Sequence, residues 1–154
     1  MANLYLVRHA KAGERRSWSG DDVDRPLSKP GWKQAKLLGA RLAELDPTTL
    51  CSSPYVRCVQ TLEPLAERIG GKVEIEERLR EEEPFEPVLD LLRELPPRSV
   101  LSTHGDLIPA VVMALERRGM TCSSRPDWRK ASVWVLKRNK HGEIVSSTVW
   151  PPPS

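Results

Sequence analysis

The amino-acid sequence predicts an α/β protein, a three-layer α/β/α sandwich with a mostly parallel central sheet. Short apolar segments alternate with segments of helical periodicity, which is the pattern of parallel strands joined by crossover helices. Near the carboxyl end, two β-rich segments flank a polar turn and predict an antiparallel hairpin. The chain of 154 residues has the size of one domain. We therefore expect a single domain over residues 1–150 and a proline-rich tail over 151–154.

The first part of the chain begins with a strand, a loop and a helix. Residues 3–8 form an apolar run typical of a buried strand, and a polar loop over about 10–29 follows it. Ser28 and Pro30 form a helix start signal, a capping residue followed by a proline in the first turn. The helix should continue to about residue 45, because its apolar residues recur at helical spacing, at Ala35, Leu38, Leu42 and Leu45.

The rest of the chain repeats this alternation. A strand is expected over 48–52, and the helix after Ser53-Pro54 should end at Gly70-Gly71, since glycine favours the left-handed conformation at a helix end. The remaining expected elements are, in order, a strand over 72–76, a helix carrying Val88 to Leu95, a strand over 99–103, a helix carrying Ile108 to Leu115, and closing strands over 131–136 and 143–150 around a turn at 139–142.

The composition limits the possible functions. Hydrophobic residues make up 39% and charged residues 29% of the chain, as in ordinary soluble domains, and no apolar stretch is long enough for a membrane span. The first residues lack a signal-peptide pattern, so a cytoplasmic location without a membrane partner is expected. A net charge of +3 does not indicate a nucleic-acid polymer as partner. The three cysteines show no CxxC spacing, which argues against a disulfide framework and a zinc site.

Three of the predicted strands end in residues suited to chemistry. Arg8 and His9 follow the first strand, Ser53 and Arg57 follow the second, and His104 follows the fourth. Because ligands bind beyond the carboxyl ends of parallel strands, these side chains should converge. Two arginines and two histidines around one point would repel each other unless an anion such as a phosphoryl group lay between them. The pattern therefore predicts a phosphate-binding site.

The same residue types indicate a reaction. An imidazole nitrogen can attack phosphorus and form a covalent phosphohistidine, while arginines hold the nonbridging oxygens in bidentate contacts. Arg57 is expected in the first turn of a helix, where free backbone N–H groups add to an anion site. Taken singly, His9 is more typical of a satisfied buried or loop histidine than of a catalyst, and Arg57 is more typical of a solvated helix residue. Only their convergence favours catalysis.

These segments resemble the histidine phosphatase superfamily, also called the phosphoglycerate-mutase-like family. LVRHAKA stands where that family has its RHG motif, SSPYVRCVQT resembles its SP..R..QT block, and STHGD resembles the segment with its second histidine. The short length and the RPLS and QTLEPLA segments are similar to a small branch, the SixA-like phosphohistidine phosphatases. WSGDD and RKASVWVL also look like the phosphatase-like domain that follows some MutT-type Nudix hydrolases. No Nudix motif is present, so we expect that domain standing alone.

The resemblance implies a phosphoglycerate-mutase-like fold and a reaction without a metal or another cofactor. It makes His9 the phosphorylated nucleophile, Arg8 and Arg57 the phosphate clamps, and His104 the second histidine of the phosphate pocket. Ala10 departs from the glycine usual in the family. Alanine could preserve a tight backbone turn there, with a less close approach to the pocket.

Four further positions are candidate site residues. Glu81 stands in an L.E pattern that resembles the family's general acid, although the run EERLREEE is also typical of a solvated acidic surface. Lys11 and Arg25 lie in the polar loop and could reach a second phosphate or an acidic protein surface. The alternative is that this loop pairs its charges internally. Ser53 is expected to contact the substrate.

The expected function is that of a metal-independent phosphatase working through phospho-His9. A SixA-like protein phosphohistidine phosphatase is the leading interpretation, because the small size suggests an open pocket that a protein can enter. Two alternatives stay open, a hydrolase of nucleotides or other small phosphoesters and a phosphate-binding module without turnover. The expected partner is thus a phosphorylated protein or a small phosphoester, and the sequence predicts no oligomeric state. A mutase is not expected, since phosphoglycerate mutases resemble this family with insertions that this chain lacks.

Overall fold

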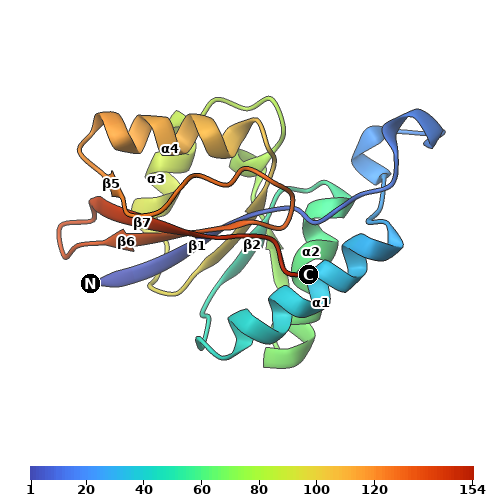
Figure 1. The fold of residues 1–154 in the computed structure, drawn as a ribbon, viewed down its shortest axis with the longest axis horizontal. Helices are drawn as coiled ribbons and strands as arrows, with labels where there is room; N and C mark the ends of the chain where they lie inside the picture. Colours follow the sequence, from blue (N-terminus) through green and yellow to red (C-terminus); the bar gives the residue numbers. More distant parts are fainter.

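The computed structural model describes residues 1–154 and contains a seven-stranded sheet with helices on both faces (Figure 1). The strands are β1 (Ala2–Arg8), β2 (Leu50–Ser52), β3 (Val73–Ile75), β4 (Val100–Thr103), β5 (Thr121–Cys122), β6 (Val133–Arg138) and β7 (Ile144–Trp150). The α-helices are α1 (Lys29–Ala43), α2 (Val56–Ile69), α3 (Glu86–Glu94) and α4 (Leu107–Arg117). The predicted three-layer sandwich is therefore confirmed.

The sheet is mostly parallel, as the sequence predicts. Its strand order is β3-β2-β4-β1-β6-β7-β5. The pairs β3-β2, β2-β4 and β4-β1 are all parallel. The closing hairpin supplies the antiparallel part, with β6 antiparallel to β1 and β7 antiparallel to β6. Strand β5 pairs in parallel with β7 and was not predicted, because two residues are too short to show a periodicity.

The two faces of the sheet form two separate hydrophobic clusters. Side chains of β1 alternate between them, since successive residues of a strand point to opposite faces. Leu4 and Leu6 belong to the cluster formed with α3 and α4, whereas Tyr5 and Val7 belong to the cluster formed with α1 and α2. Most of the apolar residues that predicted these helices belong to the clusters or pack against them. The helical periodicity in the sequence therefore reflects the packing of the helices on the two faces of the sheet.

Several predicted boundaries shift in the structure. Helix α2 begins at Val56 rather than at Pro54, because the Ser53 hydroxyl accepts a hydrogen bond from the Tyr55 N–H in a turn that precedes the helix. The helix ends at Gly70, whose φ of +66° is left-handed as expected. The last predicted hairpin occupies Val133–Arg138 and Ile144–Trp150, and no helix or strand follows it over 151–154. No helix has both the length and the apolar character needed to cross a membrane.

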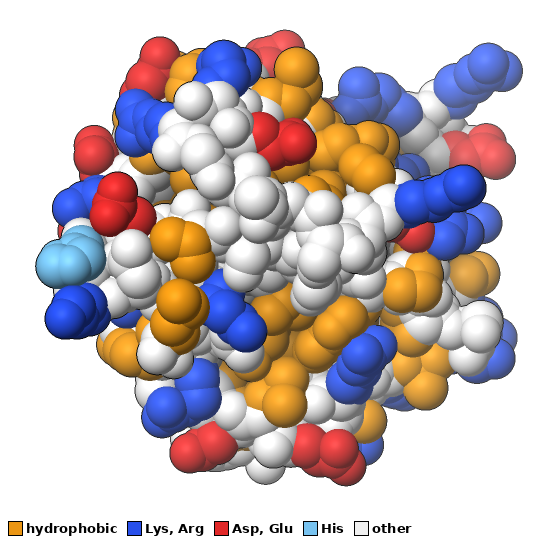
Figure 2. Space-filling view, turned by 60° about the vertical axis from the view of Figure 1, so that its left-hand side comes forward, with side chains coloured by type: hydrophobic (Ala, Val, Ile, Leu, Met, Phe, Trp, Pro, Cys, Tyr) orange, Lys and Arg blue, Asp and Glu red, His pale blue; other side chains and the backbone are white.

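The polar loop after β1 extends beyond the edge of the sheet before it returns to α1 (Figure 1). It contains two short 3₁₀ turns, Arg15–Ser17 and Asp22–Asp24, and its ends are joined by an antiparallel bridge between Ala12 and Leu27. The loop is thus organised by its own contacts. On the molecular face in Figure 2, acidic and basic side chains are interspersed and hydrophobic groups lie between them.

Candidate active site

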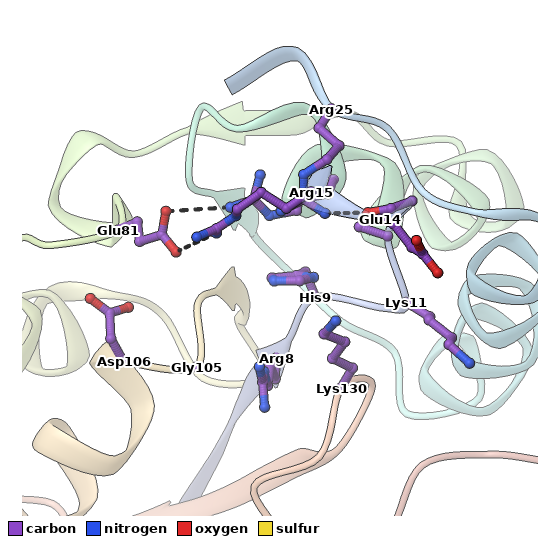
Figure 3. Close-up of a pocket in the computed structure, with 13 residues that line it drawn as sticks. Arg8, His9, Lys11, Glu14, Arg15, Arg25, Glu81, Gly105, Asp106 and Lys130 are labelled. Carbon is purple, nitrogen blue, oxygen red and sulfur yellow. Dashed lines mark hydrogen bonds and ion pairs between the residues drawn. The ribbon is translucent and has the colours of Figure 1, made fainter. Parts of the chain in front are cut away.

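A pocket of about 370 Å³ lies at the carboxyl ends of β1 and β4, where sheets of this kind bind ligands (Figure 3). Arg8 and Thr103 are direct neighbours across these two strands, so the residues that follow them, His9 and His104, come together. Their ring centroids are 5.7 Å apart. Six lysine and arginine side chains line the pocket, against only three aspartate and glutamate side chains. The predicted convergence of basic groups is therefore present.

His9 is held as a neutral imidazole with one free nitrogen. It is only 5% exposed, and its Nδ1 lies 2.8 Å from the Ala10 carbonyl oxygen, which makes Nδ1–H the donor and leaves the lone pair on Nε2. Burial lowers the pKa of His9 to about 3, and the nearby charges of Arg57 and Arg8 act in the same direction, against the Ala10 hydrogen bond. An imidazole in this state is a competent nucleophile at neutral pH.

The backbone after His9 is fixed by α2. The Ala10 N–H donates to the Thr61 hydroxyl at 2.9 Å, and this hydroxyl donates to the Arg57 carbonyl at 2.7 Å. Ala10 is fully buried, so an alanine fits at the position where the resembling family has glycine. These contacts connect the segment of His9 to the first turns of the helix that carries Arg57.

His104 is oriented by Ser53. The Ser53 hydroxyl is hydrogen-bonded to His104 Nε2 at 2.8 Å and accepts from the Tyr55 N–H at 3.3 Å. Burial, followed by the charge of Arg57, lowers the pKa of His104 to about 4. Ser53 is fully buried and does not line the pocket. Its observed contact is with the histidine, where the sequence predicts a contact with substrate.

Arg57 occupies the first turn of α2, as expected, and is 1% exposed. Its Nη1 donates to the Asp22 carbonyl at 2.9 Å, and its Nη2 lies 3.1 Å from Asp22 Oδ2 and 3.4 Å from Glu81 Oε2. Carboxylates thus offset part of the repulsion that the sequence analysis expected an anion to relieve. Because contacts with one backbone and two side-chain groups fix the guanidinium, it is preorganised for a ligand.

The guanidinium of Arg8 packs against Gly105, which has no side chain. Its Nη1 donates to the Trp128 carbonyl oxygen, and a Cβ atom built at Gly105 would lie 2.5 Å from the Arg8 Cζ. Only glycine leaves room for the guanidinium at this point. Burial lowers the pKa of Arg8, while the negative charge of Asp106 acts in the opposite direction.

The three remaining predicted residues differ in their surroundings. Glu81 lines the pocket and lies 3.6 Å from Arg15 as well as near Arg57, so it is more than part of a solvated acidic run. Arg25 is 6% exposed and donates to Asp22 Oδ1 at 3.0 Å and to the Gly13 carbonyl, which is the internal pairing described as the alternative. Lys11 lines the pocket, is exposed and forms no ion pair.

Sequence reasoning missed several charged residues of the pocket region, including Glu14 and Arg15 in the loop after β1. Asp22 contacts Arg57, Arg25 and Arg15, yet nothing in its loop distinguishes it from the neighbouring acidic residues. Asp106 directly follows His104-Gly105, and this proximity was a signal that could have found it. Lys130 reaches the pocket from the segment before β6, which only the pairing of β6 with β1 brings there.

The buried histidines should make the fold sensitive to acid. Their pKa values of about 3 and about 4 lie below the ordinary 6.5, so the unfolded chain binds more protons than the native one between these values and 6.5. Stability is therefore lost as pH falls below about 6.5. We expect His104→Gln to reduce the pH dependence of the free energy of unfolding by up to about 1.4 kcal/mol per pH unit between pH 6 and 4.5.

Urea unfolding at a series of pH values measures this slope. His141→Gln is the matched control, because His141 is exposed in the turn between β6 and β7 and should not change the slope. Asp22 also contributes to the pH dependence of stability, because its pKa is lowered: burial raises it, but Arg25 and Arg57 lower it more. This contribution is present in every variant and cancels when their slopes are compared. A His104→Gln slope equal to that of the unchanged protein would contradict the assignment of a neutral native His104.

The fold and the site define an α/β protein with a predominantly basic pocket, lined by His9, at the carboxyl ends of its parallel strands. The sequence model of the histidine phosphatase superfamily (branch 1) matches residues 4–84, which is more than half of the chain. The protein belongs to the histidine phosphatase superfamily.

Comparisons with individual proteins agree with this family. The chain is 36% identical over 156 residues to an 8-oxo-(d)GTP phosphatase of Mycolicibacterium smegmatis, in a match that covers 97% of this chain and 48% of that protein. The chain thus spans about half the length of this relative. A structure of the protein histidine phosphatase SixA with tungstate superposes with a TM-score of 0.74 at 21% identity, over 96% of this chain and 94% of that one. A mycobacterial glucosyl-3-phosphoglycerate phosphatase superposes with a TM-score of 0.71 at 20% identity over the whole of both chains.

Proposed function

We propose that the protein is a phosphatase that transfers a phosphoryl group from its substrate to Nε2 of His9 and then to water. The observation that carries this proposal is the neutral His9, whose Nδ1 is hydrogen-bonded to the backbone and which lines a pocket together with Arg8 and Arg57. A nucleophile must be unprotonated, and the charge that develops on the phosphoryl oxygens must be offset nearby. This pocket meets both conditions, and in the proposed mechanism the positive charge comes from the two arginines.

In the first step the Nε2–P bond forms and the bond from phosphorus to the leaving group breaks. Arg8 and Arg57 would hold the nonbridging oxygens. His104 lies beside the nucleophile, with its ring centroid 5.7 Å from that of His9, but it is buried and does not line the pocket. Both arginines have a buried Nε–H without an acceptor. Buried donors without partners are uncommon, and their presence on these two residues supports a site that an anionic ligand completes.

In the second step water attacks phosphorus, the P–Nε2 bond breaks and orthophosphate leaves. We assign to Glu81 the transfer of a proton to the leaving oxygen and its later removal from water, since this carboxyl group lines the pocket beside Arg57. This role applies to phosphoesters. A phosphohistidine substrate needs it less, because a protonated imidazole is already a good leaving group.

Two substrate classes are candidates within this function. A protein phosphohistidine is the first, supported by a pocket that is open to solvent and by the small branch of the family that the sequence resembles. A nucleotide or another small phosphoester is the second. The relative at 36% identity, named an 8-oxo-(d)GTP phosphatase, is the observation that favours the second candidate.

Phosphate release from a panel of donors tests the function and separates the two classes. We expect Glu81→Gln to slow release from p-nitrophenyl phosphate and nucleotides by about 10²-fold or more, since it removes a general acid. Release from a phosphohistidine protein should change far less. The third candidate, a phosphate-binding module without turnover, would be favoured if the folded protein released no phosphate from any donor.

Glu83→Gln is the matched control for this variant. It removes one carboxylate from the same acidic run, but Glu83 is exposed and does not line the pocket. Equal activity of Glu81→Gln and the unchanged protein towards every donor would remove Glu81 from the mechanism and leave the phospho-His9 proposal standing.

A further inference from the structure

The cations of the pocket differ in whether the chain itself neutralises them. Three of the arginines face carboxylates: Arg25 and Arg57 contact Asp22, and Arg15 contacts Asp22 and Glu81. Arg8 forms no ion pair and donates to the Trp128 carbonyl oxygen. The two lysines, Lys11 and Lys130, form no ion pair and no side-chain hydrogen bond within the chain. Positive charge without a carboxylate partner therefore remains at Arg8 and at these two lysines, and of the three only the lysines also lack a side-chain hydrogen bond.

The segment that carries Lys130 is held firmly against the catalytic strand. Besides the bond from Arg8 to Trp128, the Ala131 N–H lies 3.1 Å from the Arg8 carbonyl oxygen and 3.2 Å from that of His9. Ala131 is fully buried at a φ of +69°, a conformation that costs a non-glycine residue energy and is often found at functional sites. The backbone on both sides of Lys130 is thus anchored to the residues that would hold the phosphoryl group.

The two lysines point in different directions. In Figure 3 the ammonium end of Lys130 points toward His9, whereas Lys11 extends away from it. Glu81 and Asp106 lie on the other side of His9 and would repel an additional anion there. Burial, together with the neighbouring Arg8 and Arg25, lowers the pKa of Lys130, which reports positive charge concentrated at this point. An anion would be stabilised most on the Lys130 side.

We propose that Lys130 binds a second phosphoryl group of the substrate, so that the pocket takes small molecules with two linked phosphoryl groups. This inference rests on the proposed function and narrows it. In the proposed mechanism Arg8 and Arg57 already hold the nonbridging oxygens of the transferred phosphoryl group. Lys130 is a further cation directed at the same point, and a phosphoryl group adjacent to the transferred one would supply its counter-charge.

Calorimetric binding of two phosphonates tests this inference without turnover. Methylenediphosphonate carries two linked phosphonates and methylphosphonate carries one, and neither P–C bond is hydrolysed by a phosphatase. We expect the ratio of their affinities to fall about tenfold in Lys130→Ala, as for a lost charge-assisted contact. Lys130→Arg, which keeps the charge, should restore most of the ratio. Lys72→Ala, at an exposed site outside the pocket, should leave the ratio unchanged.

Each outcome separates this inference from the proposed function. An unchanged ratio in Lys130→Ala would overturn the inference, and so would an equal loss for both phosphonates, because the lysine would then bind the transferred phosphoryl group. Phosphorylation of His9 is measured in the same preparations by mass spectrometry. If His9 is phosphorylated but the ratio does not depend on Lys130, the function stands and the inference fails. If the ratio depends on Lys130 but no donor phosphorylates His9, the inference stands and the function fails.

Discussion

His9→Ala is expected to abolish phosphorylation of the protein and to reduce phosphate release by at least about 10⁴-fold, because it removes the nucleophile on which both steps depend. In the unchanged protein, brief mixing with a phosphodonor should add the mass of one phosphate to the peptide that contains His9. Mass spectrometry under mildly alkaline conditions measures this adduct, because phosphohistidine survives there.

The control for this experiment is His141→Ala. His141 is exposed and lies in the turn between β6 and β7, so both the adduct and the turnover should persist. Circular dichroism of His9→Ala establishes that the loss is chemical and not a loss of fold. An adduct on the peptide of His104 instead, or undiminished turnover in His9→Ala, would refute His9 as the nucleophile.

Arg57→Ala should lower kcat/KM by about 10³-fold, a larger effect than loss of a single neutral donor. The change removes a charge-assisted contact to the phosphoryl oxygens. In the unchanged protein Arg57 Nη2 lies 3.1 Å from Asp22 Oδ2 and 3.4 Å from Glu81 Oε2. Without the guanidinium, these two carboxylates would repel the bound phosphoryl group. Arg57→Lys should recover only part of the activity, since an ammonium cannot reproduce bidentate contacts. Steady-state phosphate release measures both variants.

A second substitution separates the two causes. If repulsion by the freed carboxylate contributes, Asp22→Asn in the Arg57→Ala background should raise kcat/KM above that of the single variant. Arg68→Ala is the matched control on the same helix, because Arg68 is exposed and forms no ion pair. Activity of Arg57→Ala close to that of Arg68→Ala would exclude Arg57 as a phosphate clamp.

Local sequence signals were sufficient for the elements that surround the site. Apolar residues at helical spacing identified all four α-helices, and the glycine at position 70 marked the end of α2 through its left-handed φ. The predicted ends of helices near turns were less accurate. The Ser53 hydroxyl accepts a hydrogen bond from the Tyr55 N–H in a turn that precedes α2, and the spacing of apolar residues does not reveal such a bond. Strand β5 was missed because it exists only through its pairing with β7.

For the candidate site, the sequence likewise predicted which residues come together but not all of their contacts. The rule that ligands bind at the carboxyl ends of parallel strands brought Arg8, His9, Arg57 and His104 together from sequence alone, since each ends a strand, directly follows one or lies in the first turn of the next helix. The direction of the Ser53 side chain was not available from sequence. Its neighbour Ser52 is equally buried and equally polar, and only the packing around β2 decides that Ser53 contacts His104.

The sequence by itself determined the α/β class, the parallel strands and the basic residues at their ends, because these follow from periodicity and chain order. Only the tertiary structure decided how the charges pair. Asp22 reaches Arg57 across 35 positions of sequence, and Lys130 reaches the pocket because β6 lies beside β1. The physical reason is that electrostatic interactions depend on distance and burial, and both are set by the packing of segments that are far apart in the chain.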